Sequence, residues 1–154
     1  HTLSWLLFGN FWVYMLDSFG WVRNPGIDST IKYISLVRRV YQSSDSCDAI
    51  LIYGSMCRGK FHDRSDLDLR IVRRVDRWKG LVALFASLML RAYAFFIMLP
   101  VDFQVVDSMA FLKRQMRQDE RPIVVYRKEY FMVENPRRAF NDVERDPFLV
   151  MMNR

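Results

Sequence analysis

The feature that most constrains the fold of this chain is a run of nineteen mostly apolar residues, 81–99, whose one charge is Arg91 and which ends before Pro100. A run of this length could cross a lipid bilayer as a helix. A charged side chain near the centre of such a helix would cost roughly 2.5 kcal/mol or more. The run therefore predicts a long helix that is buried or faces a partner, rather than a membrane span.

Length and composition predict one folded domain with its own core. Hydrophobic residues make up 51% and charged residues 26% of the 154 residues, which excludes a disordered or fibrous protein. Cys47 and Cys57 are too few for a disulfide framework and lack the spacing of zinc ligands, so we expect reduced thiols and a cytoplasmic location. The net charge of +6, from 23 basic and 17 acidic residues, is spread along the chain. Binding to nucleic acid is therefore not indicated.

The first part of the chain differs from the rest. Residues 1–22 are apolar and aromatic, with three Trp and with Asp17 as the only charge. Such a segment suits a membrane interface or a partner surface, and a helix packed on the domain is the alternative. A turn signal follows at 24–26. We expect an N-terminal segment over 1–30, which is a helix, a partner contact or a membrane-interface contact, and a domain over 31–154 that includes a C-terminal extension.

Apolar periodicity predicts a small sheet flanked by helices. Helical spacing predicts a helix over 29–42 and a shorter one after Ser108. Strand patterns occur at 49–53, 67–72, 101–106 and 123–126. The resulting order of helix, strand, strand, long helix, strand, helix and strand indicates an α/β or α+β domain around one small sheet.

A group of residues suited to phosphate follows the first predicted strand. Gly54 lacks a side chain and lets the backbone approach a ligand closely. Ser55 offers a hydroxyl and a backbone N–H at a predicted helix start, which suits a phosphate group, and Arg58 adds a cation nearby. Cys57 lies within this group, and we expect it to be a small buried residue rather than a reactive thiol.

Two carboxylates come shortly afterwards. Asp66 and Asp68 are two residues apart on a predicted strand, so their side chains leave the same face. They repel each other unless a cation lies between them. Ligand sets made only of oxygen favour Mg²⁺ or Mn²⁺ over zinc. A phosphate-binding turn beside a pair of carboxylates indicates metal-assisted phosphoryl or nucleotidyl transfer.

The combined pattern Gly54-Ser55-x-x-Arg58-Gly59-x5-Ser65-Asp66-x-Asp68-Leu69 resembles the signature of the DNA polymerase β-like nucleotidyltransferase superfamily. The minimal nucleotidyltransferases and their aminoglycoside-modifying relatives are the most similar branch. The resemblance extends over residues 31–126 and implies a small mixed sheet flanked by helices. It also implies that nucleotide-binding residues are Gly54, Ser55, Arg58 and Ser65, and that Asp66 and Asp68 bind two divalent metal ions.

The family uses a third carboxylate on a later strand. Asp102 fits that position, and Asp107 is the other candidate, although it lies at the end of the predicted strand. In this interpretation Asp102 shares one metal ion and helps to deprotonate the attacking hydroxyl. Asp66 and Asp68 precede the apolar run and Asp102 follows it, so a single membrane crossing would separate them. The resemblance is therefore a second reason to expect that the run does not span a membrane.

The resemblance implies an enzyme that transfers a nucleoside monophosphate from an NTP, with ATP the first choice, to an acceptor hydroxyl, with release of pyrophosphate. Two alternatives stay open. One is a regulatory, antitoxin-like module that adenylylates or binds a protein partner, and the other is the soluble domain of a membrane-associated enzyme. In both, the apolar segments 1–22 and 81–99 would contact a partner, another copy or a membrane surface. The acceptor and the base preference stay open.

Overall fold

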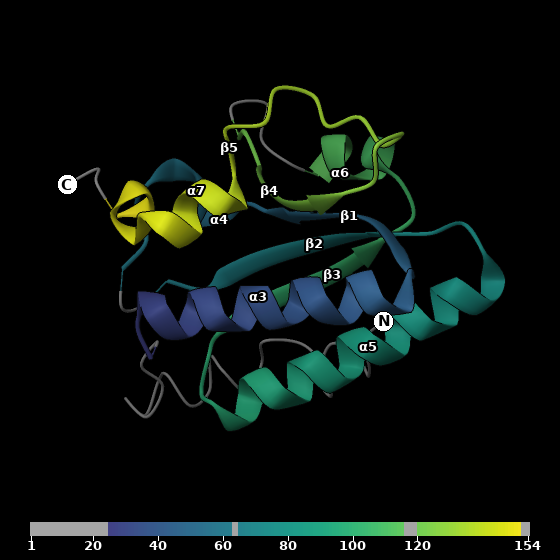
Figure 1. Ribbon diagram of the computed structural model, residues 1–154, viewed down its shortest axis with the longest axis horizontal. Helices are drawn as coiled ribbons and strands as arrows, with labels where there is room; N and C mark the ends of the chain where they lie inside the picture. The colour runs from purple at the N-terminus through teal and green to yellow at the C-terminus, as the bar shows by residue number, and fades with distance from the viewer. Residues whose placement is uncertain (1–24, 63–64, 116–119, 152–154) are drawn as a thin grey trace.

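Five strands form one mixed sheet in the order β3-β2-β1-β4-β5 (Figure 1). The central strand β1 (Cys47–Ile52) runs antiparallel to both neighbours, β2 (Leu67–Arg73) and β4 (Ile123–Arg127). Strand β2 pairs in parallel with β3 (Val101–Val106), and β4 pairs in parallel with the two-residue β5 (Arg138–Ala139). This computed structural model describes residues 25–62, 65–115 and 120–151. The expected mixed α/β, or α+β, class is confirmed.

Two long helices cover one face of the sheet, α3 (Ile27–Ser44) and α5 (Arg77–Phe96) (Figure 1). The hydroxyl of Tyr33, early in α3, donates to the carbonyl of Leu90, late in α5, over 3.0 Å. The hydroxyl of Tyr41, late in α3, donates to the carbonyl of Ala83, early in α5, also over 3.0 Å. The two helices are therefore antiparallel, and both buried phenols have partners, as buried hydroxyls require.

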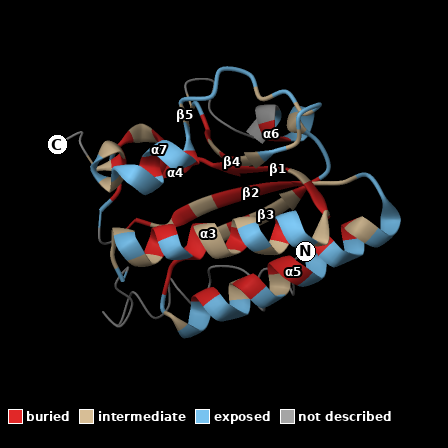
Figure 2. Ribbon diagram, in the orientation of Figure 1, coloured by how far each residue is buried: buried red, intermediate tan, exposed pale blue. Residues whose placement is uncertain are grey.

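Alternation along β2 separates the two faces of the sheet. One set of side chains enters the large core beneath α3 and α5, and its members are Leu67, Leu69 and Ile71. The intervening set, Asp68, Arg70 and Val72, leaves the opposite face, because successive strand residues point in opposite directions. On that face the short helix α6 (Met109–Gln115) contributes Leu112 to a smaller cluster with Val72 and Val106. The carboxylates thus lie on the face that α3 and α5 leave uncovered. Figure 2 shows that α3 and α5 are buried along one side and exposed along the other.

Most of the predicted elements are present, with small differences at their ends. The strand expected at 101–106 is confirmed with the same bounds. Helix α5 begins at Arg77, four residues before the apolar run, because Asp76 caps it by accepting the backbone N–H of Lys79 over 3.0 Å. Helix α3 begins at Ile27, so it extends across the domain boundary expected after residue 30. The predicted contacts of segment 1–22 lie outside the described residues.

The C-terminal extension belongs to the core rather than lying beside it. It forms β5, the helix α7 (Phe140–Arg145) and a 3-10 turn, Pro147–Val150. Phe140, Val143 and Val150 are buried in the same cluster as the long helices. The carbonyl of Val150 accepts the backbone N–H of Phe61 over 3.2 Å, which joins the end of the chain to the loop that follows Gly59.

Helix α5 is, among the described residues, the one helix long and apolar enough to cross a membrane by length and composition, and 33% of its most apolar window is buried. Its small residues face inward, with Ala83, Ala86 and Ala94 in the core beside Leu90. Small side chains allow the helix to approach the sheet and α3 closely. One face of α5 is therefore part of the domain core, in agreement with the expected buried or partner-facing helix.

Candidate active site

The parallel pairing of β2 with β3 places Asp68 directly opposite Asp102. Both side chains leave the same face of the sheet. Asp66, expected on the same strand, lies one residue before β2, and its charge is close enough to act on Asp68. Asp107, the alternative third carboxylate, lies beyond the other end of β3. There it is 74% exposed and paired with Arg73. Of the two candidates on this strand, Asp102 is the one that lies beside Asp68.

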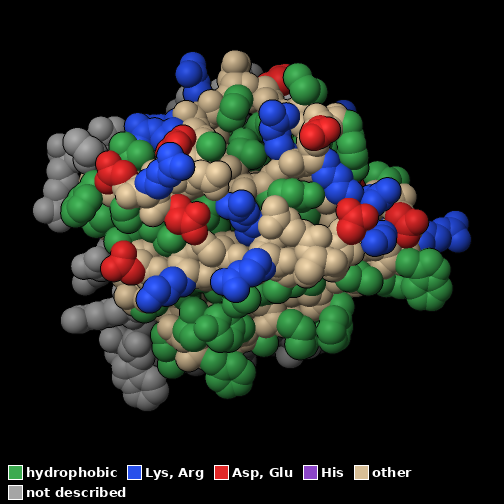
Figure 3. Space-filling view, in the orientation of Figure 1, with side chains coloured by type: hydrophobic (Ala, Val, Ile, Leu, Met, Phe, Trp, Pro, Cys, Tyr) green, Lys and Arg blue, Asp and Glu red, His purple; other side chains and the backbone are tan. Residues whose placement is uncertain are grey.

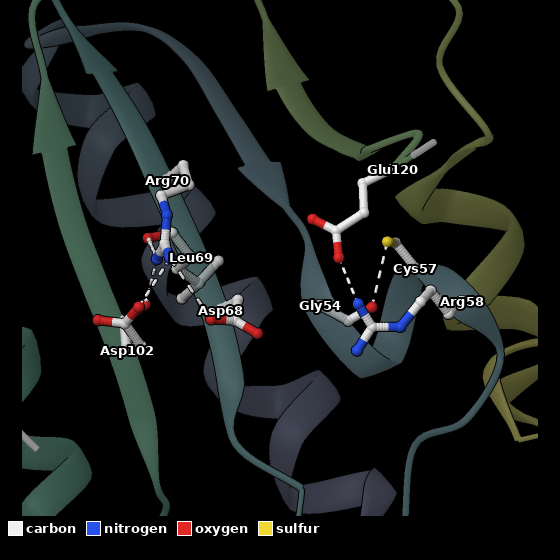
Figure 4. Close-up of polar contacts among 8 residues, drawn as sticks. All are labelled: Gly54, Cys57, Arg58, Asp68, Leu69, Arg70, Asp102 and Glu120. Atoms are coloured by element: carbon white, nitrogen blue, oxygen red, sulfur yellow. Dashed lines mark hydrogen bonds and ion pairs between the residues drawn. The ribbon is translucent and has the colours of Figure 1, made fainter. Parts of the chain in front are cut away.

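Arg70 is the cation of this carboxylate group (Figure 4). Its Nη2 lies 2.7 Å from Oδ2 of Asp102 and 3.4 Å from Oδ1 of Asp68. Its Nη1 also donates to the main-chain carbonyls of Asp102, over 3.0 Å, and Leu69, over 3.2 Å. The Arg70 side chain is 9% exposed, and its Nε is buried without a hydrogen-bond partner. The guanidinium therefore bridges the two strands at the carboxylates.

Burial raises the pKa of Asp68 to about 6, with further upward contributions from the charges of Asp66, Asp102 and Glu120 and a downward one from Arg70. The Asp68 side chain is 20% exposed, whereas that of Asp102 is 42% exposed. Desolvation and neighbouring carboxylates both disfavour the ionised form. Strongly shifted carboxyl groups of this kind are common in catalytic and metal-binding sites.

The turn after β1 reaches the carboxylates through Gly54. Gly54 has a φ of +70°, and a β-carbon at this position would lie 1.8 Å from Oδ2 of Asp68. The backbone N–H of the preceding residue, Tyr53, donates to the main-chain carbonyl of Asp68 over 3.0 Å. Glycine is therefore required here both by backbone conformation and by close contact.

The short helix α4 (Gly54–Arg58) presents Ser55 beside this contact. The Oγ of Ser55 is buried and has no hydrogen-bond partner. An unsatisfied buried hydroxyl is costly and calls for an explanation, such as a bound group. Cys57 is 1% exposed, and its thiol donates to the carbonyl of Gly54 over 3.2 Å. Burial raises the pKa of Cys57 to about 11, so the expectation of a buried, unreactive thiol is confirmed.

A basic pocket of about 300 Å³ lies on the other side of this turn, lined by Cys57, Arg58, Glu120, Arg121 and Arg137. Arg58 forms an ion pair with Glu120, whose side chain is 8% exposed. Arg137 donates to the carbonyl of Cys57 and so connects the C-terminal extension to the turn. Figure 4 shows the Arg58–Glu120 pair across Gly54 from the Asp68–Arg70–Asp102 group. Three arginines against one glutamate make the pocket favourable for anions.

Ser65, predicted to bind the nucleotide, has a structural role in this conformation. It is 5% exposed, and its Oγ accepts the backbone N–H of His62 over 3.0 Å. Its own N–H donates to the carbonyl of His62 over 2.8 Å. Ser65 thus closes the loop that leads into β2.

The donor set matches a hard divalent cation in chemistry, since it offers only carboxylate oxygens and the unpartnered hydroxyl of Ser55. Across the described ranges, however, no three His, Cys, Asp or Glu side chains gather closely enough to hold a metal ion. Arg70 lies between Asp68 and Asp102 instead. A divalent cation at these carboxylates would therefore compete with the Arg70 guanidinium.

Four residues of this region were not singled out from the sequence: Arg70, Glu120, Arg121 and Arg137. Arg70 could have been found, because it lies two residues after Asp68 and strand periodicity places both on one face. Glu120, Arg121 and Arg137 follow no motif, and only the path of the later chain brings them to the turn.

The chain matches no protein-family model, and no curated protein matches it either. The resemblance to nucleotidyltransferases therefore depends on the signature residues and on how they lie in the fold.

Proposed function

We propose that this chain is a divalent-metal-dependent nucleotidyltransferase that moves a nucleoside monophosphate from an NTP to an acceptor hydroxyl. The observation that carries the proposal is the register of β2 and β3. It sets Asp68 against Asp102, with the backbone of Gly54 in contact with Asp68. Residues far apart in the sequence thereby lie side by side, which supports the proposal. A cytoplasmic location with reduced cysteines is part of the same proposal, since both cysteines are free and buried.

The turn and the basic pocket would hold the phosphates. The unpartnered Oγ of Ser55 is available to donate to a phosphate oxygen. Arg58, Arg121 and Arg137 line the pocket next to it, and arginine binds phosphate through charge-assisted hydrogen bonds. The phosphate tail would displace Glu120 from Arg58, exchanging one anion for another.

The carboxylates would act at the reacting end of the nucleotide. Mg²⁺ or Mn²⁺ held by Asp66, Asp68 and Asp102 would supply charge neutralisation at the reacting phosphate. Asp102 is the more exposed of the two facing carboxylates, so it is the one placed to receive the proton of an acceptor hydroxyl. Arg70 would release the carboxylates on metal binding and keep its hydrogen bonds to the main chain.

The test is a calorimetric titration of Mn²⁺ with and without ATP. We expect the wild type to bind Mn²⁺ more tightly when ATP is present, and Asp66→Asn and Asp68→Asn to lose most of this binding while staying folded. Asp107→Asn is the matched control, because it removes a carboxylate that pairs with Arg73 outside the site. Equal Mn²⁺ binding by all four proteins would refute the metal assignment.

One observation favours a second function. Arg70 pairs with both Asp68 and Asp102, and a module that binds a nucleotide or a protein partner without transferring a group would need no other cation at these carboxylates. This regulatory, antitoxin-like module predicts ATP binding that does not depend on Mn²⁺ and that survives Asp68→Asn. The same titration therefore separates the two functions.

A further inference from the structure

Helix α5 is apolar on both sides, although only one side is packed. Its inner face belongs to the core, as described above. Its outer face carries large exposed side chains at helical spacing, and we define this outer face as Trp78, Leu81, Val82, Phe85, Met89 and Phe96. Trp78 is 79%, Phe85 65% and Phe96 80% exposed. Figure 3 shows hydrophobic side chains gathered along this edge of the molecule.

A surface helix normally carries polar or charged residues on its outer side, and a helix that is apolar all round is normally buried. The charged residues of α5 are Arg77, Lys79 and Arg91. Arg91 lies on the inner side, with its guanidinium 5.9 Å from the ring centre of Phe103. The outer face therefore consists mainly of apolar side chains that are exposed to water. A contiguous apolar patch of this kind indicates a docking surface.

A groove continues the outer face toward the edge of the sheet. It has a volume of about 480 Å³ and lies between the first turns of α5 and β3, with Leu81, Leu84 and Val105 among its lining residues. Strand β3 is at the edge of the sheet, so no further strand of the described residues covers this side of the groove. A space of this size can take the ring of a large side chain.

The described part of the chain begins near this surface. Tyr33, six residues into α3, stacks on Tyr93, three residues before the end of α5, with ring centres 6.3 Å apart. Since the helices are antiparallel, the start of α3 lies within about 5 Å of the end of α5 along its axis, at 1.5 Å per residue. The chain before α3 therefore emerges beside Phe96, and Gly26, at φ +99°, turns it there.

Twenty-two residues are enough to run along the whole outer face. From Phe96 back to Trp78 is eighteen residues of α5, or about 27 Å. Residues 1–22 would cover about 33 Å as a helix and more in an extended conformation. They contain Trp5, Trp12 and Trp21 and one charge, so they would bury aromatic surface at little cost in desolvated charge.

We propose that residues 1–22 pack along the outer face of α5 and cover it, with an aromatic side chain in the groove beside β3. The segment and the face are each apolar, so contact between them would bury apolar surface on both. Intramolecular docking also has an entropic advantage over a separate partner, because the short connection at residues 23–26 keeps the effective concentration high.

The test uses the full 154-residue chain in a Trp78→Phe background, which leaves indole signals only from Trp5, Trp12 and Trp21. A nitroxide is attached at Met89→Cys, on the outer face. The control nitroxide is at Met132→Cys, which is 77% exposed and lies between residues that pack on the opposite face of the sheet. Cys47 and Cys57 are buried, so labelling is selective. We expect the Met89 label, and not the Met132 label, to remove most of the indole peak height in the NMR spectrum.

Two further samples assign the occupant. In a mixture of isotope-labelled chains without nitroxide and unlabelled chains carrying it, full indole peak heights support docking within one chain, and loss of height overturns it in favour of a second copy. Indole peaks unaffected by the Met89 label in the monomer overturn the proposal. Binding of the Met89 label to phosphatidylcholine–phosphatidylglycerol vesicles, with release of the indoles, overturns it in favour of a membrane surface. Phe85→Gln, a change at an exposed side chain that leaves the core intact, should restore indole peak height.

Discussion

The backbone of Gly54 lies against the carboxylate of Asp68, so closely that a β-carbon at position 54 would be 1.8 Å from Oδ2 of Asp68. This contact joins the turn after β1 to the strand that carries the acidic residues. The two ends of the signature, Gly54 and Asp68, are therefore in contact although fourteen residues separate them in numbering.

Replacing this glycine should therefore be more harmful than replacing a glycine with backbone strain alone. Gly54→Ala places a side chain at φ +70° and against Asp68, whereas Gly26→Ala at φ +99° meets nothing within 4 Å. We expect Gly26→Ala to lower the free energy of unfolding by about 1–2 kcal/mol. Gly54→Ala should lower it by about 1–3 kcal/mol more, because the new side chain also overpacks against Asp68. Urea unfolding measures both. Equal losses for the two variants would contradict the contact.

The raised pKa of Asp68 predicts an unusual pH dependence of stability. With its pKa raised to about 6 in the folded protein from an ordinary 3.8, Asp68 binds its proton more tightly when folded. Its contribution to stability is therefore complete below pH 4 and is lost as the pH rises through about 6. The difference between the folded and the ordinary pKa of Asp68 corresponds to a change of up to about 3 kcal/mol in the free energy of unfolding.

Asp68→Asn should remove this dependence. In EDTA, the wild-type free energy of unfolding should fall between pH 4 and pH 6.5 relative to that of Asp68→Asn, and the variant should be the more stable protein at pH 7. Asp107 should change the pH dependence of stability in the opposite direction, which Asp107→Asn tests. A hydrogen bond from Arg73 lowers the pKa of Asp107, so its stabilisation is present at neutral pH and is lost on acidification. Parallel pH curves for wild type and Asp68→Asn would rule out the raised pKa.

Arg70 should matter for stability only while no metal is bound. Arg70→Met leaves Asp68 and Asp102 without their cation and should destabilise the metal-free protein by on the order of 2–3 kcal/mol, because removing one partner of a buried ion pair leaves the other charge uncompensated. Mn²⁺ should restore much of this loss and bind more tightly to the variant than to the wild type, since its competitor is gone. Thermal unfolding with and without Mn²⁺ measures both effects.

Arg74→Met is the matched control for that experiment. Arg74 pairs with Asp45, and both side chains are more than 40% exposed, so its loss should change stability by about 1 kcal/mol or less and should not respond to Mn²⁺. An Arg70→Met protein as stable as Arg74→Met would show that the guanidinium does not hold the carboxylates together.

The parts of the fold that the sequence predicted well are those in which local periodicity and burial agree. The strand at 101–106 alternates over its first four residues, because one face enters the core and the other carries Asp102 and Gln104. The pattern failed where tertiary contacts decide. The C-terminal extension is too short in each piece to show periodicity, and Phe140 and Val150 are ordered by the core they enter.

The candidate site divides in the same way. Gly54, Asp66 and Asp68 can be found from the sequence because they lie within fifteen positions and belong to one signature. Arg70 does not stand out in the sequence, because the strand at 67–72 is predicted from apolar alternation and that pattern gives no sign of a counterion for Asp68. Glu120 and Arg137 could not be found, since their approach to the turn depends on how the chain after β3 returns to it.

The last prediction separates binding from transfer at β3. If Asp102 receives the acceptor proton, Asp102→Asn should reduce the rate of transfer by ~10²–10⁴ while changing ATP affinity far less, because the phosphates would be held by Ser55 and the arginines of the basic pocket. Asp107→Asn, on the same strand but paired with Arg73, should keep full activity. The assay follows labelled nucleotide onto the protein itself first, since no acceptor is known, and measures ATP binding in parallel. If Asp107→Asn loses activity and Asp102→Asn keeps it, the proton acceptor is Asp107 and the assignment of Asp102 is wrong. If Asp102→Asn loses ATP binding and transfer equally, Asp102 is a binding residue only.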